Sequence, residues 1–270
     1  MPGTFGSRHP SAVLRSHLMV IGPRLQSGAL STRGCLFCRR HDGGFLSPEH
    51  VYPEAIANVD ELVLPPGVVC DRCNHGPLAR ADRSLVDFPV VQMLRAERGI
   101  PTKKGKPVQA QFRDATLYWT GPGDLTVESK KERGPVMRDL GGGRFTTGEL
   151  KSTSPVKDAT FRNIAHAVWK MAIEWLYVLL GPAAGFDPVF DPVRHAILGT
   201  GDRTGWLLTR VTAWPHDHIQ LTARPEIIRG HKCLPTFFSV FGFDLWTDPL
   251  RRHIPRERIS PPFEANVWIF

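Results

Sequence analysis

Four of the five cysteines form two CxxC pairs, a spacing that is typical of metal binding. The pairs are Cys35 with Cys38 and Cys70 with Cys73, and Cys233 stands alone. Each CxxC turn places two thiolates on one side of a tight loop, so two turns can complete a closed tetrahedral S4 site for structural zinc. A redox pair or an iron–sulfur cluster is the alternative, but a redox CxxC occurs singly within a thioredoxin-type βαβ pattern, which this sequence lacks. We predict structural Zn2+ on the four paired cysteines and a buried thiol at Cys233.

An acid–histidine pair, Glu49-His50, lies between the two cysteine pairs, and Asn74 directly follows the second pair. A histidine side chain ionises near neutral pH, which suits a general base. Carboxylate and amide oxygens are hard ligands that suit Mg2+ or Mn2+. An isolated Glu-His dipeptide is usually an ordinary surface pair. Its position between two CxxC pairs favours a catalytic or once-catalytic site.

The order of these elements, CxxC-x10-EH-x19-CxxCN with VYP after the histidine, covers residues 35–74. It resembles the HNH endonuclease family with a zinc-stapled ββα-metal fold, and a looser resemblance extends to about residue 90. The resemblance implies that His50 is the general base that activates a water molecule for attack on a DNA phosphate. It also implies that Glu49 and Asn74 bind one catalytic divalent ion, Mg2+ or Mn2+. The cysteine-bound zinc would hold these residues in register.

The chain departs from the family pattern in two places. The family usually has an asparagine shortly before the second CxxC, which orients the base, whereas this chain has only apolar residues, proline and glycine from Leu64 to Val69. A backbone carbonyl or Asn58 would have to orient His50 instead. The acid is glutamate where aspartate is commoner. His75, next to Asn74, is an alternative metal ligand.

A basic charge balance favours a polyanionic partner. The formal net charge is +8 and the sequence pI is about 9.5, and DNA is the expected partner. The expected DNA contacts lie around the proposed site, and their alternative role is ordinary solubility: Arg39, Arg40, Arg72, Arg80 and Arg83. Nothing in the sequence encodes recognition of particular bases.

The fold class that we expect is α+β, with a small zinc-stapled ββα-metal domain followed by a second α+β domain. The expected segments are a disordered basic leader (1–33), the HNH nuclease domain (34–100), a linker (101–107) and a C-terminal domain of unknown role (108–270). The second domain should contain a hairpin near residues 108–123, one long helix at 155–180 and a mainly antiparallel sheet. Its strands are expected at 206–214, 218–223 and 237–246.

The sequence predicts an intracellular enzyme without a membrane span. The most apolar run, 164–180, is interrupted by Lys170 and Glu174, so we expect a core helix there. Cysteines spaced for metal binding indicate a reducing compartment, and we expect a cytoplasmic location. The predicted function is metal-dependent hydrolysis of phosphodiester bonds in DNA. The alternatives are a non-catalytic zinc module that binds nucleic acid and an interaction adaptor on the same scaffold.

Overall fold

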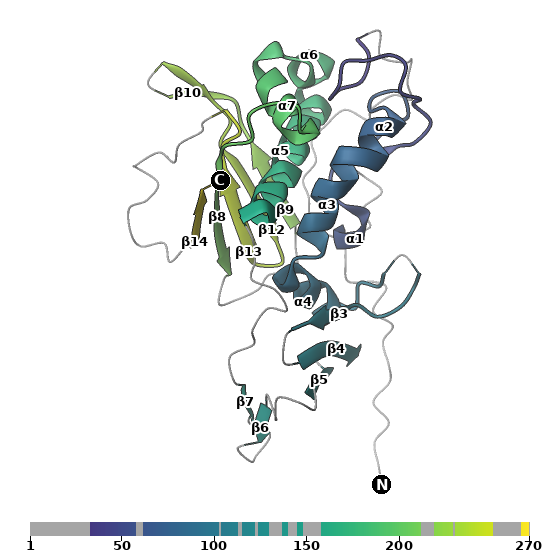
Figure 1. Cartoon of the computed structure of the whole chain (residues 1–270), viewed down its shortest axis with the longest axis vertical. Coiled ribbons are helices and arrows are strands. Elements are labelled where there is room, and N and C mark those ends of the chain that lie inside the picture. Colours follow the sequence, from purple (N-terminus) through teal and green to yellow (C-terminus); the bar gives the residue numbers. More distant parts are fainter. Residues whose placement is uncertain are drawn as a thin grey trace.

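The chain is described here from a computed structural model (Figure 1). The described residues are 33–57, 62–102, 104–112, 115–121, 124–129, 137–139, 145–147, 158–211, 219–228, 230–250 and 266–269. The expected leader therefore lies outside the described residues, apart from its last residue, and so does Asn58.

The N-terminal part contains two short strands followed by helices. Its elements are β1 (Glu49–His50), α1 (Glu54–Ala57), β2 (Val63–Leu64), α2 (Asp71–Cys73), the π-helical turn η2 (Asn74–Leu78), α3 (Ala79–Val86) and α4 (Pro89–Glu97). Strands β1 and β2 pair antiparallel, with Glu49 opposite Leu64 and His50 opposite Val63. In chain order the unit is strand, short helix, strand, helix, because α1 lies between β1 and β2.

The helix that follows the second cysteine pair starts earlier than its sequence indicates. Pro77 is a favourable first residue of a helix, so the sequence predicts a start there, yet the helical segment begins at Asp71. Gly76 breaks the regular backbone at φ −102° and ψ −106°, and the turn around it is π-helical. This irregular turn accommodates Pro77, which lacks an N–H, without ending the helical segment.

The C-terminal part places one long helix against an antiparallel sheet. Its helices are α5 (Asp158–Leu180), α6 (Pro182–Gly185), the 3-10 turn η4 (Pro188–Phe190) and α7 (Asp191–Leu198). The sheet strands are β8 (Trp206–Val211), β9 (Ile219–Ala223), β12 (Thr236–Val240), β13 (Phe243–Thr247) and β14 (Asn266–Ile269), in the order β14-β8-β13-β12-β9. All neighbouring strands in this sheet are antiparallel, as expected.

Local sequence explains where several of these elements end. Gly181 follows α5 at φ +85°, and its N–H donates to the carbonyl of Tyr177 at 3.0 Å, which caps the helix. The β12–β13 hairpin turns at Phe241 and Gly242, both with positive φ. Positive φ at both central residues is the geometry of a type I′ turn, which matches the twist of the two strands.

Three smaller sheets complete the described structure. The first contains β3 (Gln109–Gln111), β4 (Ala115–Gly121) and β5 (Asp124–Ser129), and it includes the expected hairpin. The other two are pairs: β6 (Met137–Asp139) with β7 (Phe145–Thr147), and β10 (Glu226–Ile228) with β11 (His231–Cys233).

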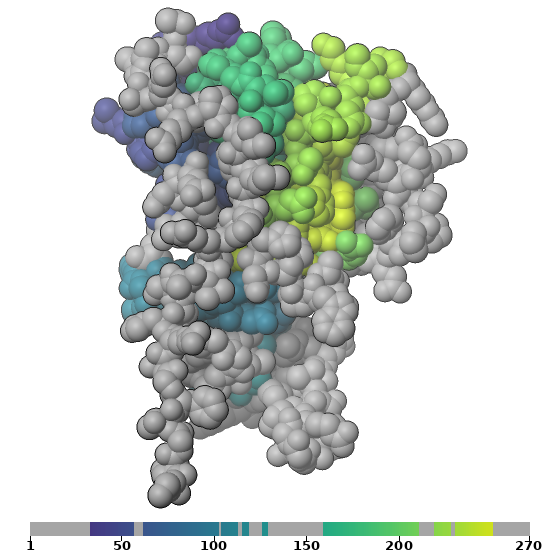
Figure 2. Space-filling view, turned by 180° about the vertical axis from the view of Figure 1, so that it is seen from behind, coloured from purple at the N-terminus to yellow at the C-terminus, as the bar shows by residue number. Residues whose placement is uncertain are grey.

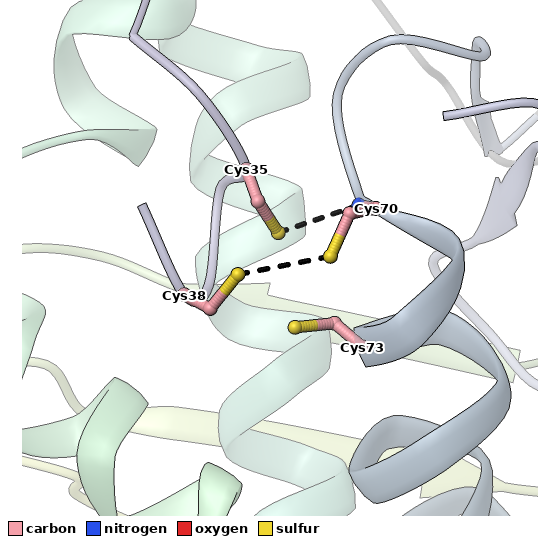
Figure 3. Close-up of side chains that lie close together, drawn as sticks. All are labelled: Cys35, Cys38, Cys70 and Cys73. Carbon is pink, nitrogen blue, oxygen red and sulfur yellow. Dashed lines mark hydrogen bonds between the residues drawn. The ribbon is translucent and has the colours of Figure 1, made fainter. Parts of the chain in front are cut away.

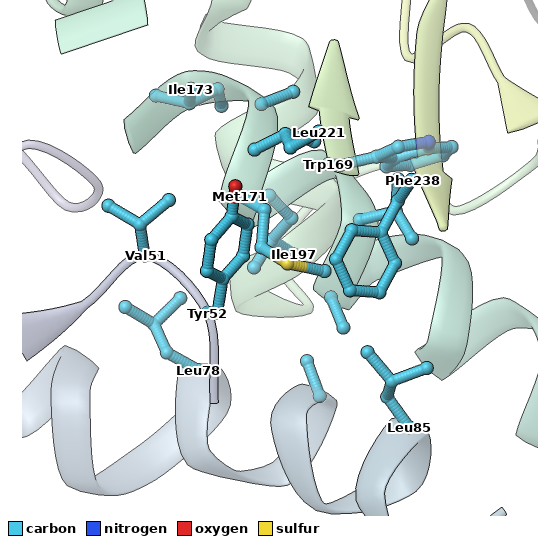
Figure 4. Close-up of a cluster of buried hydrophobic side chains, with 14 of the residues drawn as sticks. Val51, Tyr52, Leu78, Leu85, Trp169, Met171, Ile173, Ile197, Leu221 and Phe238 are labelled. Atoms are coloured by element: carbon cyan, nitrogen blue, oxygen red, sulfur yellow. The ribbon is translucent and has the colours of Figure 1, made fainter. Parts of the chain in front are cut away.

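One continuous hydrophobic core connects the N-terminal part with the C-terminal part. Helix α5 packs between α3 on one side and the strands β8, β9, β12 and β13 on the other (Figure 1). Tyr52 and Leu85 meet Trp169, Met171 and Phe238 in this core (Figure 4). Seen from the opposite side, the green surface of the 158–198 segment lies between the blue-purple N-terminal surface and the yellow-green sheet (Figure 2). The expected domain boundary at 101–107 stays a prediction, but residues before and after it belong to one hydrophobic core.

Among the described residues, no helix is both long enough and apolar enough to cross a membrane. The interruption of α5 by Lys170 and Glu174 agrees with this finding.

Candidate functional site

The four paired cysteines converge on one point. Cys35 and Cys38 lie on the loop before β1, whereas Cys70 precedes α2 and Cys73 is its last residue, and the sulfur atoms face one another (Figure 3). The four Sγ atoms lie within 4.8 Å of one another, and the Sγ atoms of Cys38 and Cys70 are 3.7 Å apart. Four sulfur atoms bonded to one zinc ion at about 2.3 Å would be about 3.8 Å apart in a tetrahedron. The cluster could therefore hold a structural metal such as zinc.

Backbone donors favour the thiolate form of Cys35, whereas burial raises the pKa of Cys70 to about 11. The amides of Phe37 and Cys70 donate to the Sγ of Cys35 at 3.4 and 3.3 Å. The thiol of Cys73 and these backbone amides lower the pKa of Cys35 to about 5, although burial opposes the change. A thiolate is the form that binds a metal ion, so the donor set fits zinc. Cys233 is buried and lies outside this cluster, as the sequence indicates.

Three side chains of the α2–η2 segment anchor the loop that leads into β1. The carboxylate of Asp71 accepts from the amides of Ser47 and Leu46 at 2.9 and 3.2 Å. These backbone bonds lower the pKa of Asp71 below its ordinary value. Asn74 Nδ2 donates to the carbonyl of Pro48 at 2.9 Å, and His75 Nε2 lies 3.2 Å from the hydroxyl of Ser47. Asn74 and His75 therefore lie beside the residues that immediately precede Glu49-His50.

Glu49 and His50 have different environments because successive side chains of a strand point to opposite faces. Glu49 is only 4% exposed, whereas His50 is half-buried. The carboxylate of Glu49 forms a salt bridge of 2.7 Å with Lys170 Nζ. Burial of Glu49 against a lysine is not apparent from the sequence, since the two residues are far apart in the chain.

Lys170, on α5, is at the centre of a buried polar cluster. It is fully buried, and its Nζ lies 2.7 Å from Glu49 Oε1, 2.7 Å from Asp82 Oδ2 and 3.0 Å from the carbonyl oxygen of His50. The ammonium donates hydrogen bonds to Asp82 and to the His50 carbonyl, and it forms an ion pair with Glu49. The carboxylate of Glu174 lies further away, at 3.8 Å, and its two buried oxygens have no hydrogen-bond partner among the described residues.

The charges in this cluster are shifted by burial and by one another. Burial favours the neutral form of Lys170, but the carboxylates of Asp82, Glu174 and Glu49 outweigh it and raise the pKa of the ammonium. Burial raises the pKa of Asp82 to about 6 against the opposing effect of Lys170. Burial also raises the pKa of Glu174 well above its ordinary value. Burial therefore favours the neutral form of Glu174, whereas the surrounding carboxylates favour the charged form of Lys170.

The predicted DNA-contacting arginines divide into two groups. Arg39, Arg40 and Arg72 line a cavity of about 400 Å3 between the cysteine loop and α7. Arg39 is paired there with Asp191 at 3.0 Å, while Arg40 and Arg72 lie 2.6 and 3.9 Å from Asp42.

The second group, Arg80 and Arg83, lies on α3, and both side chains are exposed. Their positive charge is available to an anionic partner.

Sequence reasoning missed Lys170, Asp82 and Glu174 as members of the site. A usable signal was present: Lys170 and Glu174 are four residues apart in an otherwise apolar helical run, so both lie on one face of the helix. Charged residues are almost never fully buried unless they are paired. A partner elsewhere in the chain could have been expected, but not its identity.

Comparisons with protein-family models, with curated proteins and with solved structures give no match to this chain. The family resemblance therefore depends on the sequence motif alone.

Proposed function

We propose that this protein is an HNH-type endonuclease that hydrolyses phosphodiester bonds in DNA with one divalent metal ion. The observation that carries the proposal is that two separate parts of the motif, the Glu49-His50 strand and the segment that follows Cys70, lie side by side in the structure. The cysteine cluster and the Asn74–Pro48 hydrogen bond bring the start of the α2–η2 segment against the strand that bears Glu49 and His50. Pro48 and Asn74, which are 26 positions apart, thus meet in one local unit in which β1 pairs with β2 and the α2–η2 segment follows.

His50 is the proposed general base. Its imidazole lies on the less buried face of β1, where it can accept a proton from a water molecule that attacks phosphorus. The carbonyl of His50 is held by Lys170 on the opposite side, so its backbone is fixed while the ring remains accessible.

Glu49 and Asn74 are the proposed ligands of the catalytic ion. Glu49 uses Oε1 for Lys170, and Asn74 uses Nδ2 for Pro48, which leaves Glu49 Oε2 and Asn74 Oδ1 as hard oxygen donors. Two protein ligands suit Mg2+, which usually keeps several water molecules. When bound, such an ion polarises the scissile phosphate and stabilises the leaving oxygen.

The burial of Glu49 favours a second candidate function, a zinc-stapled nucleic-acid-binding module without catalysis. A carboxylate that is 4% exposed and paired with Lys170 is already neutralised without a metal ion. In that case Glu49 would connect β1 to α5, and the exposed arginines of α3 would bind the phosphate backbone.

A plasmid-nicking assay with Mg2+ or Mn2+ separates the two functions. We expect metal-dependent cutting by the wild type and its loss in His50→Ala. The matched control is His231→Ala, which removes an exposed histidine on β11 and should cut at the wild-type rate. Wild-type binding of plasmid without any cutting, in both metals, would refute the nuclease and support the binding module.

A further inference from the structure

We infer that Lys170 is the positioning residue of the proposed site and that it does the work of the asparagine missing before the second CxxC. This inference rests on the proposed function, because it assigns a role within that same site. It also identifies what the C-terminal part of the chain contributes to the site, which is a positively charged side chain on α5 that contacts β1.

Lys170 contacts both residues of β1. Its Nζ binds the side chain of Glu49 and the carbonyl of His50, so one ammonium fixes two consecutive residues of a two-residue strand. It also donates a hydrogen bond to Asp82 on α3. Lys170 therefore joins β1, α3 and α5 through two hydrogen bonds and an ion pair.

The segment that would normally supply the orienting asparagine has no side chain for this purpose. Between β2 and the second CxxC, Val68 and Val69 are buried at 5% and 1% exposure, and Gly67 adopts φ +100°. The described part of this segment thus contributes to the core. The polar contact that fixes the backbone of His50 comes instead from Lys170 on α5, which lies 120 residues after His50 in the chain.

Stability alone does not explain a lysine at this position. A buried charge costs several kcal/mol of desolvation, and apolar residues of similar size are often as stabilising as a buried ion pair. Lys170 is fully buried among carboxylates. The groups that it holds are the proposed base and the proposed metal ligand, which gives the charge a role in placing them.

The test uses full-length chains with Lys170→Met. Removing only the lysine would leave Glu49 and Asp82 as buried charges without a cation, so a second variant, Lys170→Met with Asp82→Asn, removes one of them. Asp82→Asn alone and Lys232→Met are controls; Lys232 is exposed on β11. Zinc content and melting establish that each variant is folded.

The first measurement is plasmid cutting. We expect kcat of the double variant to fall about 10–100-fold relative to Asp82→Asn, as for other residues that orient ligands, with KM changed by less than about threefold because DNA contacts are intact. Equal kcat in these two variants would overturn the inference. A double variant that loses its fold or its zinc would also overturn it, because Lys170 would then be a structural residue.

The second measurement is hydrogen exchange of residues 49–64 in the zinc-bound protein without Mg2+ or Mn2+, which does not depend on the cutting of DNA. We expect amides of β1 and β2 to lose protection in the double variant while α5 keeps it. If the wild type does not cut DNA at all, the proposed function fails, and exchange alone decides whether Lys170 holds the strand. Unchanged exchange in that case would overturn the inference as well.

Discussion

Loss of one paired cysteine should cost more stability than loss of the unpaired one. In Cys70→Ser, three thiols remain in the cluster, and a hydroxyl is a poor zinc ligand. Structural zinc binds zinc-finger peptides with a free energy of about 10–16 kcal/mol. At about 1 µM free zinc, this affinity stabilises the folded chain by about 2–8 kcal/mol. The total stability of a domain is only about 5–15 kcal/mol.

The structure makes this loss a property of the whole molecule. Cys35 and Cys70 are fully buried and belong to the core that includes α5 and the sheet. Failure of the cluster should therefore lower the single melting transition instead of releasing a separate unit. For a chain of this size we expect Tm to fall by at least about 5 °C.

The assay compares Cys70→Ser with Cys233→Ser in thermal melts and in zinc measurements. Cys233 is 1% exposed and lies outside the cluster, so its variant controls for loss of a buried thiol. We expect one zinc per chain in the wild type and in Cys233→Ser, and none in Cys70→Ser. A Cys70→Ser protein that retains zinc and melts with Cys233→Ser would refute the reasoning.

Three further predictions concern pH, packing and charge. Burial, with Arg203 and Arg162, lowers the pKa of His166 from 6.5 to about 4; the stability of its neutral form is present above pH 6.5 and lost as pH falls toward 4. When the pH falls from 7 to 5, the free energy of unfolding of His166→Phe, measured by urea titration, should therefore decrease by about 2 kcal/mol less than that of the wild type. Phe238→Ala, at a fully buried ring that contacts Tyr52, should cost about 3–5 kcal/mol by the same method; a loss under about 1 kcal/mol would contradict the shared core. Arg80→Gln with Arg83→Gln should reduce the salt-dependence slope of DNA binding by about two, and an unchanged slope would remove α3 as a contact.

Local patterns predicted several elements correctly. The 3.6-residue periodicity and the Gly181-Pro182 stop indicated the long helix, which is α5, and strand-forming residues indicated β8 and β9. The single strand expected at 237–246 was wrong in one respect, because the turn at Phe241 and Gly242 divides it into β12 and β13. The CxxC spacing indicated the convergence of four cysteines. These features depend on residues close together in sequence, where chain geometry limits the possibilities.

The start of the helical segment at Asp71 could not be predicted, because Pro77 is a favourable first helical residue and indicates a later start. The π-helical turn at Asn74–Leu78 is stabilised by its surroundings, including the bonds of Asn74 and His75 to the loop before β1. Those partners are more than twenty residues away, so no local propensity identifies them.

The sequence by itself determined which residue types could do chemistry: four thiols at CxxC spacing, an acid–histidine pair and an asparagine. Only the tertiary structure decided that Glu49 is buried, that Lys170 is its partner and that the two parts of the chain share one core. The physical reason is that a lysine can be fully buried only where acceptors for all its protons meet. Those acceptors come from β1 and α3, which are separated from α5 along the chain and are brought to it by folding.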